Sequence, residues 1–221
     1  TINGQMLLAW LTEAFITQPG FEVIQVNTDG VTVRLPKNQR RHLDLISTEW
    51  QNRTGLQLES VDYSIMAVRD VNNYISVTPD GKVKRKGAYE IDPDWHKDHS
   101  SLVVQKAVSA WLLNGTDPTE FIYAHADAYD FMRHVKVRRS DTLTWGDETI
   151  QNTTRYHIAL AGKPLTKHMP PLAGAVGDRM IGVDVGWDVQ VCNRAVDFDW
   201  KNLNRRFYIT EAEKLITGLG G

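Results

Sequence analysis

The stretch Asn27-Thr28-Asp29-Gly30 constrains the fold of this chain more than any other feature. Short runs in which apolar and polar residues alternate stand on both sides of it. Such alternation is typical of β-strands, and Asp-Gly is a common hairpin turn because both residues tolerate positive φ. The pattern therefore predicts two antiparallel strands, at about residues 21–27 and 30–35, with Asp29 at the exposed tip.

The remaining patterns predict an α+β fold in which an antiparallel sheet carries helices on one face. Helices are expected at about 2–16, 39–53, 100–114, 117–134 and 209–217, and strands at about 74–78, 83–89, 154–160 and 180–192. The segment 56–70 should hold one or two strands, and segments 138–150 and 162–178 read as loops. Hairpins give way to helices near 91–100, which predicts domains at 1–95 and 96–221, the second of them mixed and largely helical.

Composition narrows the class of protein. The chain has 221 residues, a net charge of −2 and a single cysteine, Cys192. A near-neutral charge argues against a protein coated in basic residues but allows a local basic groove. One cysteine permits no intrachain disulfide and is typical of a reducing compartment. No apolar run reaches the length of a membrane span, so we expect no membrane partner and a cytoplasmic location.

The order of five segments along the chain indicates a family: Thr1–Leu8, Asn27–Gly30, Asn72–Val77, Val83–Gly87 and Ser100–Leu113. In that order they resemble parts of family B DNA polymerases of phage or plasmid type. These parts are the palm helix that leads into motif C, the motif C hairpin, the strand with the Lys-x-Tyr primer contact, the next strand with its glycine turn, and the helix that enters the thumb. The resemblance covers roughly residues 1–115, and it implies a palm followed by a thumb.

Motif C of that family is an Asp-Thr-Asp hairpin that carries catalytic metal. The resemblance implies that Asp29 is the catalytic, Mg²⁺-binding aspartate, next to Thr28. Asn27 replaces the first aspartate of the motif, and Gly30 replaces a serine that often follows. Phosphoryl transfer of this kind uses two metal ions, and one carboxylate cannot hold both.

The family's second metal-binding aspartate, in motif A, and its nucleotide-binding residues, in motif B, precede motif C. Neither motif is in this chain, which begins in a helical pattern without Met. We therefore expect the C-terminal palm and thumb part of a DNA-directed DNA polymerase, inactive alone. Its partners would be primer–template DNA, deoxynucleoside triphosphates and an N-terminal polymerase part that bears motifs A and B.

Lys82, Lys84 and Lys86 alternate along one predicted strand, so their side chains should share a face, with Arg85 on the other. Three lysines on one face suit a sugar–phosphate backbone. They equally suit a solvated edge strand, which natural sheets often protect with lysine. The resemblance favours DNA.

The strand before these lysines carries the resemblance further. It places Tyr74 near the minor groove of the primer. Asn72 and Asn73 stand where the family has a lysine, and the amide of Asn73 could still hydrogen-bond to minor-groove acceptors. Gly87 would supply the glycine turn that ends the following strand.

A second basic run, which includes Arg138 and Arg139, follows the predicted helix 117–134. Cations at a helix C-terminus complement the helix dipole. Alternatively, these arginines contact duplex phosphates from the thumb. The sequence leaves both interpretations open.

Two other functions remain compatible with the sequence. The chain could be a non-catalytic DNA-binding or accessory module derived from a polymerase, an interpretation that Asn27 favours. It could also be an unrelated α+β domain whose hairpin happens to match the motif, which predicts no affinity for DNA.

Overall fold

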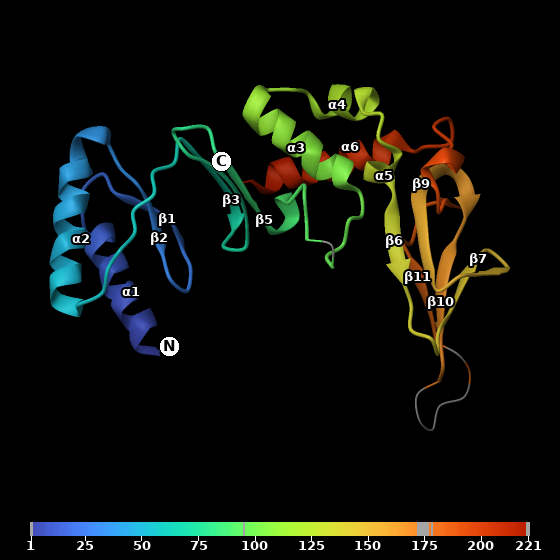
Figure 1. The fold of residues 1–221 in the computed structure, drawn as a ribbon, viewed down its shortest axis with the longest axis horizontal. Coiled ribbons are helices and arrows are strands. Elements are labelled where there is room, and N and C mark those ends of the chain that lie inside the picture. The colour runs from blue at the N-terminus through green and yellow to red at the C-terminus, as the bar shows by residue number, and fades with distance from the viewer. Residues whose placement is uncertain (1, 95, 172–176, 178, 220–221) are drawn as a thin grey trace. The chain divides into compact units, whose positions relative to one another are not determined.

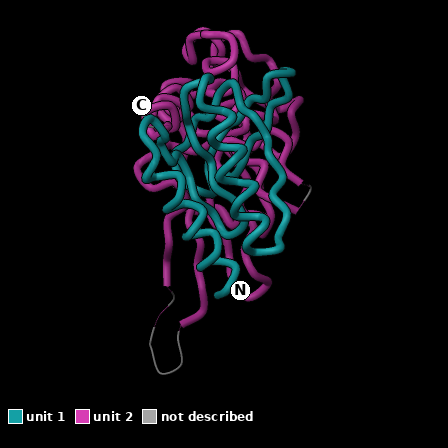
Figure 2. Tube along the Cα trace, turned by 90° about the vertical axis from the view of Figure 1, so that its left-hand side faces the viewer, with its two compact units in different colours: residues 1–87, 220–221 teal, residues 88–219 magenta. Residues whose placement is uncertain are grey.

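The computed structural model describes residues 2–94, 96–171, 177 and 179–219 (Figure 1). The chain forms two compact units, the first ending at Gly87 and the second spanning Ala88–Leu219, which are coloured separately in Figure 2. Both units combine helices with antiparallel strands, so the predicted α+β class is confirmed.

The division between the units falls at Gly87–Ala88, earlier than the predicted domain boundary after residue 95. Tyr89 explains the difference. Its side chain is fully buried, and its hydroxyl donates a hydrogen bond to the carbonyl oxygen of Leu215 at 3.1 Å. The segment after Gly87 is therefore anchored in the second unit.

The first unit contains the elements that the sequence predicts for it. Its helices are α1 (Ile2–Ile16) and α2 (Arg40–Thr54), and its strands are β1 (Glu22–Val26), β2 (Val31–Arg34), β3 (Ile65–Asp70), β4 (Asn73–Val77) and β5 (Val83–Lys86). Thr1, the first residue of the palm-like segment, lies outside the described residues. The segment 56–70 holds one strand, β3.

Apolar side chains from both helices hold the first unit together. Leu11 and Phe15 of α1 and Trp50 of α2 are buried in one cluster, and Val23 and Val33 of the β1–β2 hairpin pack against it. The indole nitrogen of Trp50 donates to the carbonyl oxygen of Leu7 at 2.9 Å. This cluster fixes the hairpin on α1.

A β-bulge in β1 shifts the alternation that the sequence predicts. Val23 pairs with Val33 and Gln25 with Thr32, so Ile24 is an extra residue. As a result, Gln25 is buried, and Val26 next to the loop is exposed. A bulge re-aims the side chains that follow it.

The expected single sheet is divided into two in this unit, β1–β2 and β3–β4–β5, each antiparallel. The buried side chain of Gln25 links them, because its Nε2 donates to the carbonyl oxygen of Val71 at 3.2 Å. Val71 lies in the turn between β3 and β4, so this bond holds the two hairpins together near their ends.

The second unit is richer in strand than the sequence indicates. Its helices are α3 (Leu102–Asn114), α4 (Pro118–Ala124), α5 (Ala128–Phe131) and α6 (Arg205–Gly218). Its strands are β6 (Arg133–Lys136), β7 (Thr142–Trp145), β8 (Glu148–Ile150), β9 (Thr153–Lys163), β10 (Leu165–Met169), β11 (Arg179–Val183) and β12 (Val189–Val191). They form two antiparallel sheets, β12–β9–β6 and β11–β10–β7–β8. The predicted loops 138–150 and 162–178 thus hold β7, β8 and β10.

The predicted helix 117–134 is wrong. Asp117 caps α4, and the helix ends at Ala124. Asp127 then caps α5, accepting from the amide of Tyr129 at 2.9 Å. Asp130 is buried there and accepts from Lys106 Nζ at 2.7 Å and from His125 Nε2 at 2.5 Å. A second cap and a buried carboxylate therefore break the helical pattern.

The basic run after α5 begins on strand β6 and continues into a loop, so the helix-dipole interpretation of these cations is wrong as well. Arg133 of β6 forms a two-bonded ion pair with Asp184, with its Nε 2.8 Å from Oδ2 and its Nη2 3.0 Å from Oδ1. Its Nη1 donates to Ser101 Oγ at 2.9 Å. Ser101 stands at the N-cap position of α3, but its side chain makes no capping bond to the helix.

No helix in the described part of the chain has the length and apolar character needed to cross a bilayer.

Candidate functional site

The loop that joins β1 to β2 presents Asp29 to solvent. The amide of Asn27 donates to the carbonyl oxygen of Gly30 at 3.0 Å, and the amide of Asp29 donates to Asn27 Oδ1 at 3.1 Å. Neither Asp29 nor Gly30 has the positive φ expected of an Asp-Gly turn. The side chain of Asn27 therefore shapes the loop.

The carboxylate of Asp29 is available for a ligand. Asp29 is exposed, and within the described residues its carboxylate takes part in no hydrogen bond or ion pair. Gly30 leaves room for the side chain of Asn27, because a Cβ at Gly30 would lie only 3.3 Å from Asn27 Oδ1. Carboxylate oxygens are preferred ligands of Mg²⁺, so this loop can contribute one such ligand.

A pocket of about 440 Å³ lies beside the loop. Three segments of the first unit line it: α1 with Gln5, Leu8 and Ala9, the β1–β2 hairpin with Val26, Asn27 and Thr28, and the β3–β4 turn with Val71 and Asn72. The pocket therefore brings together the helix, hairpin and strand that the resemblance selects. Val71 carried no signal in the sequence, since the bond of its carbonyl oxygen to Gln25 depends on tertiary packing.

Asp70, which the sequence analysis missed, organises the β3–β4 turn. Its two carboxylate oxygens accept from Asn73 Nδ2 at 2.7 and 2.9 Å, and one of them accepts from the amide of Asn72 at 3.0 Å. These bonds hold the pKa of Asp70 below its usual range, and the bond from Asn73 has the largest effect. An Asp that precedes a turn often bonds to the backbone two residues on, which is the signal that could have identified it.

Asn73, predicted to contact DNA, uses its amide nitrogen inside the protein. Both carboxylate oxygens of Asp70 accept from it. The minor-groove role of Asn73 stays a prediction, and its observed role is to shape the turn that lines the pocket.

The structure explains why residue 87, predicted as the glycine of a turn, is a glycine. Its φ is +61°, and a Cβ there would overlap the carbonyl oxygen of Asn72 and the side-chain oxygen of Asn73. The chain can pass behind the β3–β4 turn only because residue 87 lacks a side chain.

We expect Gly87→Ala to lower the free energy of unfolding of the first unit by about 2–4 kcal/mol, from backbone strain plus the overlap. Gly81→Ala is the matched control, because Gly81 has φ of +84° and open space around its Cβ position. It should cost about 1 kcal/mol. Calorimetric unfolding of the chain measures both losses, and equal losses would contradict the close approach at Gly87.

Tyr74, Lys84 and Lys86 form a shared surface, which we call the tyrosine–lysine face. Tyr74 pairs directly with Lys86 across β4 and β5, and Ser76 pairs with Lys84. Directly paired residues project to the same side of a sheet. Lys84 Nζ lies 5.9 Å from the centre of the Tyr74 ring, and both lysines are exposed.

The alternation of these lysines is borne out in β5, where Arg85 pairs with Ile75 on the opposite face. Lys82 precedes the strand, in the turn where its carbonyl oxygen accepts from the amide of Thr78 at 3.0 Å. β5 is an edge strand, so the geometry fits a protected edge as well as a DNA contact.

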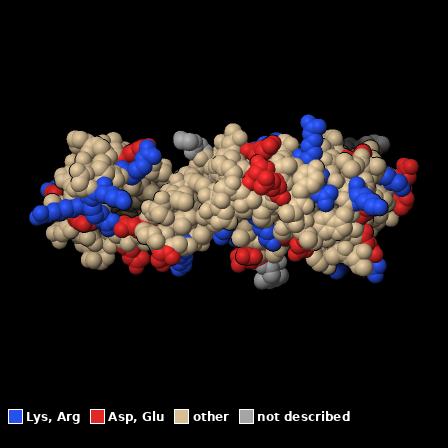
Figure 3. Space-filling view, turned by 90° about the horizontal axis from the view of Figure 1, so that it is seen from above, with Lys and Arg blue, Asp and Glu red and all other residues tan. Residues whose placement is uncertain are grey.

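Arg138 and Arg139 belong to the second unit, in the loop between β6 and β7. Both side chains are exposed. Figure 3 shows positive and negative side chains interspersed on the face in view, so a nucleic-acid contact would depend on local groups such as these rather than on a basic coat.

Asp29 does not belong to a preformed metal cluster in the described part of the chain, where no group of three or more His, Cys, Asp or Glu residues could hold a metal ion. The Asp29 loop fits a role as one contributor to a metal site that other groups complete. No protein-family model matches this chain, and no curated protein matches it.

Proposed function

We propose that this chain is the C-terminal palm and thumb part of a DNA-directed DNA polymerase of the family B type. In this proposal Asp29 is a ligand of the catalytic Mg²⁺. The tyrosine–lysine face and the basic loop of Arg138 and Arg139 contact duplex DNA. The protein would work in the cytoplasm of a bacterial or phage-infected cell.

One observation carries the proposal. An exposed carboxylate with no protein partner among the described residues stands on a hairpin loop, and that loop shares a pocket with α1 and the β3–β4 turn. A palm needs this arrangement, since the metal ligand must lie where the primer end and the incoming nucleotide meet. The bond between Gln25 and Val71 keeps the two hairpins in place.

Asp29 and, more weakly, the amide oxygen of Asn27 would hold the metal from this side. Bound magnesium would activate the primer hydroxyl and stabilise charge on the phosphate in transfer. A second carboxylate and the residues that bind the nucleotide must come from a polypeptide part with motifs A and B. The chain alone is therefore expected to bind DNA without extending it.

The alternative is a non-catalytic DNA-binding or accessory module with the polymerase framework. Asn27 favours it, because its side chain closes the loop through the amide of Asp29 and brings no charge to the site. The two functions differ in whether Asp29 matters for synthesis.

Binding of the chain to a primer–template duplex, measured over a range of salt concentrations with and without Mg²⁺, tests the DNA contact that both functions share. Affinity should fall steeply as salt rises, because bound lysines and arginines release counterions from the phosphates. Binding that is absent at low salt both for this chain and for its mixture with the N-terminal polymerase part would contradict the proposal.

The double substitution Lys84→Ala and Lys86→Ala should weaken duplex binding about 10-fold or more at low salt. It should also reduce the slope of log affinity against log salt by about 2, since each phosphate contact contributes about 0.9. Fluorescence anisotropy of a labelled duplex measures both quantities.

Lys37→Ala with Arg41→Ala is the matched control for charge. Both residues are exposed cations of the first unit, outside the tyrosine–lysine face. The control should keep the wild-type slope. If both double variants behave alike, the tyrosine–lysine face is a solvated edge and not a DNA contact.

A further inference from the structure

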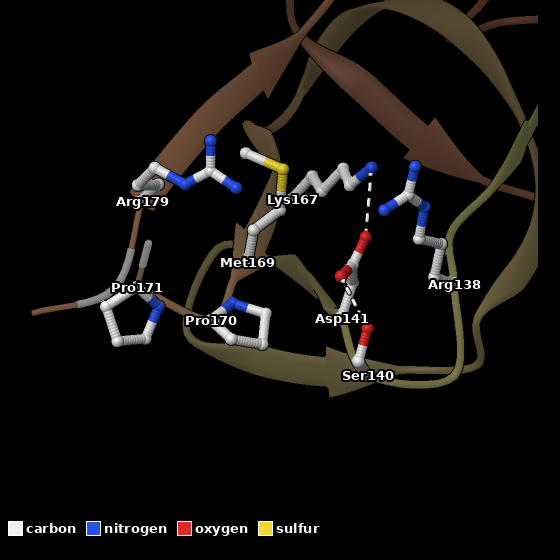
Figure 4. Close-up of a pocket in the computed structure, with 8 residues that line it drawn as sticks. All are labelled: Arg138, Ser140, Asp141, Lys167, Met169, Pro170, Pro171 and Arg179. Carbon is white, nitrogen blue, oxygen red and sulfur yellow. Dashed lines mark hydrogen bonds and ion pairs between the residues drawn. The ribbon is translucent and has the colours of Figure 1, made fainter. Parts of the chain in front are cut away.

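A second pocket, of about 390 Å³, lies in the second unit and has a different chemistry (Figure 4). Its cationic wall comes from Arg138 after β6, Lys167 on β10 and Arg179 on β11. Met169, Pro170 and Pro171 supply an apolar wall. The volume is within the roughly 300–1,000 Å³ of small-molecule sites.

The register of the sheet explains why these groups meet. Met169 pairs directly with Arg179 across β10 and β11, and Lys167 lies two residues before Met169 on the same strand. All three side chains therefore project from the same face. In Figure 4 the guanidinium groups of Arg138 and Arg179 enter the pocket from opposite sides, with Lys167 between them.

The loop that carries Arg138 is fixed by hydrogen bonds. The side-chain amide of Asn152 donates to the carbonyl oxygens of Arg138 and Asp141 at 3.1 and 3.3 Å, and the amide of Asp141 donates to the Arg138 carbonyl at 3.0 Å. Arg138 therefore starts from a preorganised backbone, which reduces the entropy cost of binding a ligand.

The described lining residues of this pocket carry more positive than negative charge. Asp141 is buried and pairs with Lys167, with Nζ 3.0 Å from Oδ2, while Ser140 Oγ donates to its other oxygen at 3.1 Å. The hydrogen bond from Lys167, and to a smaller extent that from Ser140, holds the pKa of Asp141 below its usual range. Within residues 2–94, 96–171, 177 and 179–219, no carboxylate pairs with the guanidinium of Arg138 or Arg179. Counted over the described lining residues alone, two positive charges remain after the pair of Lys167 and Asp141.

We propose that this pocket binds a nucleoside 5′-phosphate, either a free mononucleotide or the 5′-phosphorylated end of a strand. Two guanidinium groups that have no carboxylate partner among the described residues suit a phosphate monoester, which carries about −1.5 to −2 charge at neutral pH. An internal phosphodiester carries one charge and would leave the other arginine unmatched. The wall of Met169 and Pro170 offers an apolar surface to the sugar and base.

This inference requires neither a duplex nor a metal ion, but it shares Arg138 with the proposed duplex contact. Calorimetric titration of the intact chain with thymidine 5′-monophosphate, thymidine, inorganic phosphate and short oligothymidylates with or without a 5′-phosphate tests it. The phosphorylated ligands should bind at least about 10-fold more tightly than their unphosphorylated counterparts. Comparison of the mononucleotide with the phosphorylated strand identifies the source of the phosphate.

Arg138→Ala with Arg179→Ala should weaken binding of the 5′-phosphorylated ligand by about 10- to 100-fold. Arg139→Ala is the control, because Arg139 is exposed next to Arg138 and does not line the pocket. Arg179→Lys keeps the charge but loses the two-pronged contact, so it should lie between wild type and the double variant.

The Lys84→Ala, Lys86→Ala variant should bind the mononucleotide like wild type, which separates this site from the tyrosine–lysine face. Three results would each overturn the proposal: no preference for the phosphorylated ligand, equal losses in the double variant and the Arg139 control, or binding of inorganic phosphate as tight as that of the mononucleotide. The last would mean that the pocket is a simple anion site.

Discussion

Replacing Asp29 with alanine should abolish templated DNA synthesis by the assembled polymerase and leave its affinity for primer–template nearly unchanged. In the proposed function, the assembled enzyme would be this chain together with a part that bears motifs A and B, in one polypeptide or as a mixed pair. The metal contributes several kcal/mol to the transition state of phosphoryl transfer, so we expect a loss of about 1,000-fold or more in kcat. Binding should persist because the tyrosine–lysine face is intact.

Asp80→Ala is the matched control for this experiment. Asp80 is also an exposed aspartate before a glycine in a hairpin turn of the first unit, between β4 and β5. It should synthesise DNA at the wild-type rate. Primer extension under single-turnover conditions measures both variants, and synthesis that survives Asp29→Ala would remove Asp29 from the metal site and favour the accessory-module function.

Asp184→Asn should lower the free energy of unfolding of the second unit by about 2–4 kcal/mol, as expected when one partner of a largely buried ion pair is neutralised. Asp184 accepts from Arg133 through both oxygens and from the Tyr156 hydroxyl at 2.8 Å. Burial and the charge of Asp184 raise the pKa of Tyr156 well above its usual range. Asparagine keeps the shape and tolerates the φ of +49° at this position, so the substitution removes the charge and one of the two acceptor oxygens without straining the backbone.

Asp197→Asn is the control for the ion pair. Asp197 also pairs with one arginine, Arg194, through two bonds of 2.7 and 2.8 Å, but its side chain is 52% exposed, against 16% for Asp184. Exposed pairs contribute about 0–1 kcal/mol. Urea unfolding of the chain measures both losses, and equal losses would contradict the role of Asp184 in joining β6, β9 and the turn before β12.

The sequence predicts the first unit well because its signals are local. The pattern of α1, the hairpin at Asp29 and the strands predicted at about 74–78 and 83–89 each depend on neighbouring residues, and the structure contains all of them. The bulge at Ile24 could not be predicted, since it depends on tertiary packing. That bulge buries Gln25 and so decides which residues line the candidate site.

The second unit shows where local patterns fail. The helical pattern after Asp117 holds for the seven residues of α4, about two turns, and then ends. Tertiary contacts replace it, because Asp130 is buried against Lys106 and His125. Short strands such as β7 and β10 gave little signal, because each is stabilised by pairing with a distant segment. Arg138 and Arg179, which are 41 residues apart in number, meet through long-range pairing of this kind and through the hydrogen bonds of Asn152 to the loop of Arg138.

The most direct test of the central claim is to locate the catalytic metal. Fe²⁺ that replaces Mg²⁺ in the assembled polymerase on primer–template, with ascorbate and peroxide, cuts the backbone next to the metal. We predict a cut within residues 26–30 in the wild type and in Asp80→Ala, and no cut there in Asp29→Ala. Cleavage that avoids this loop, or that survives Asp29→Ala unchanged, would contradict the assignment of Asp29 as a metal ligand.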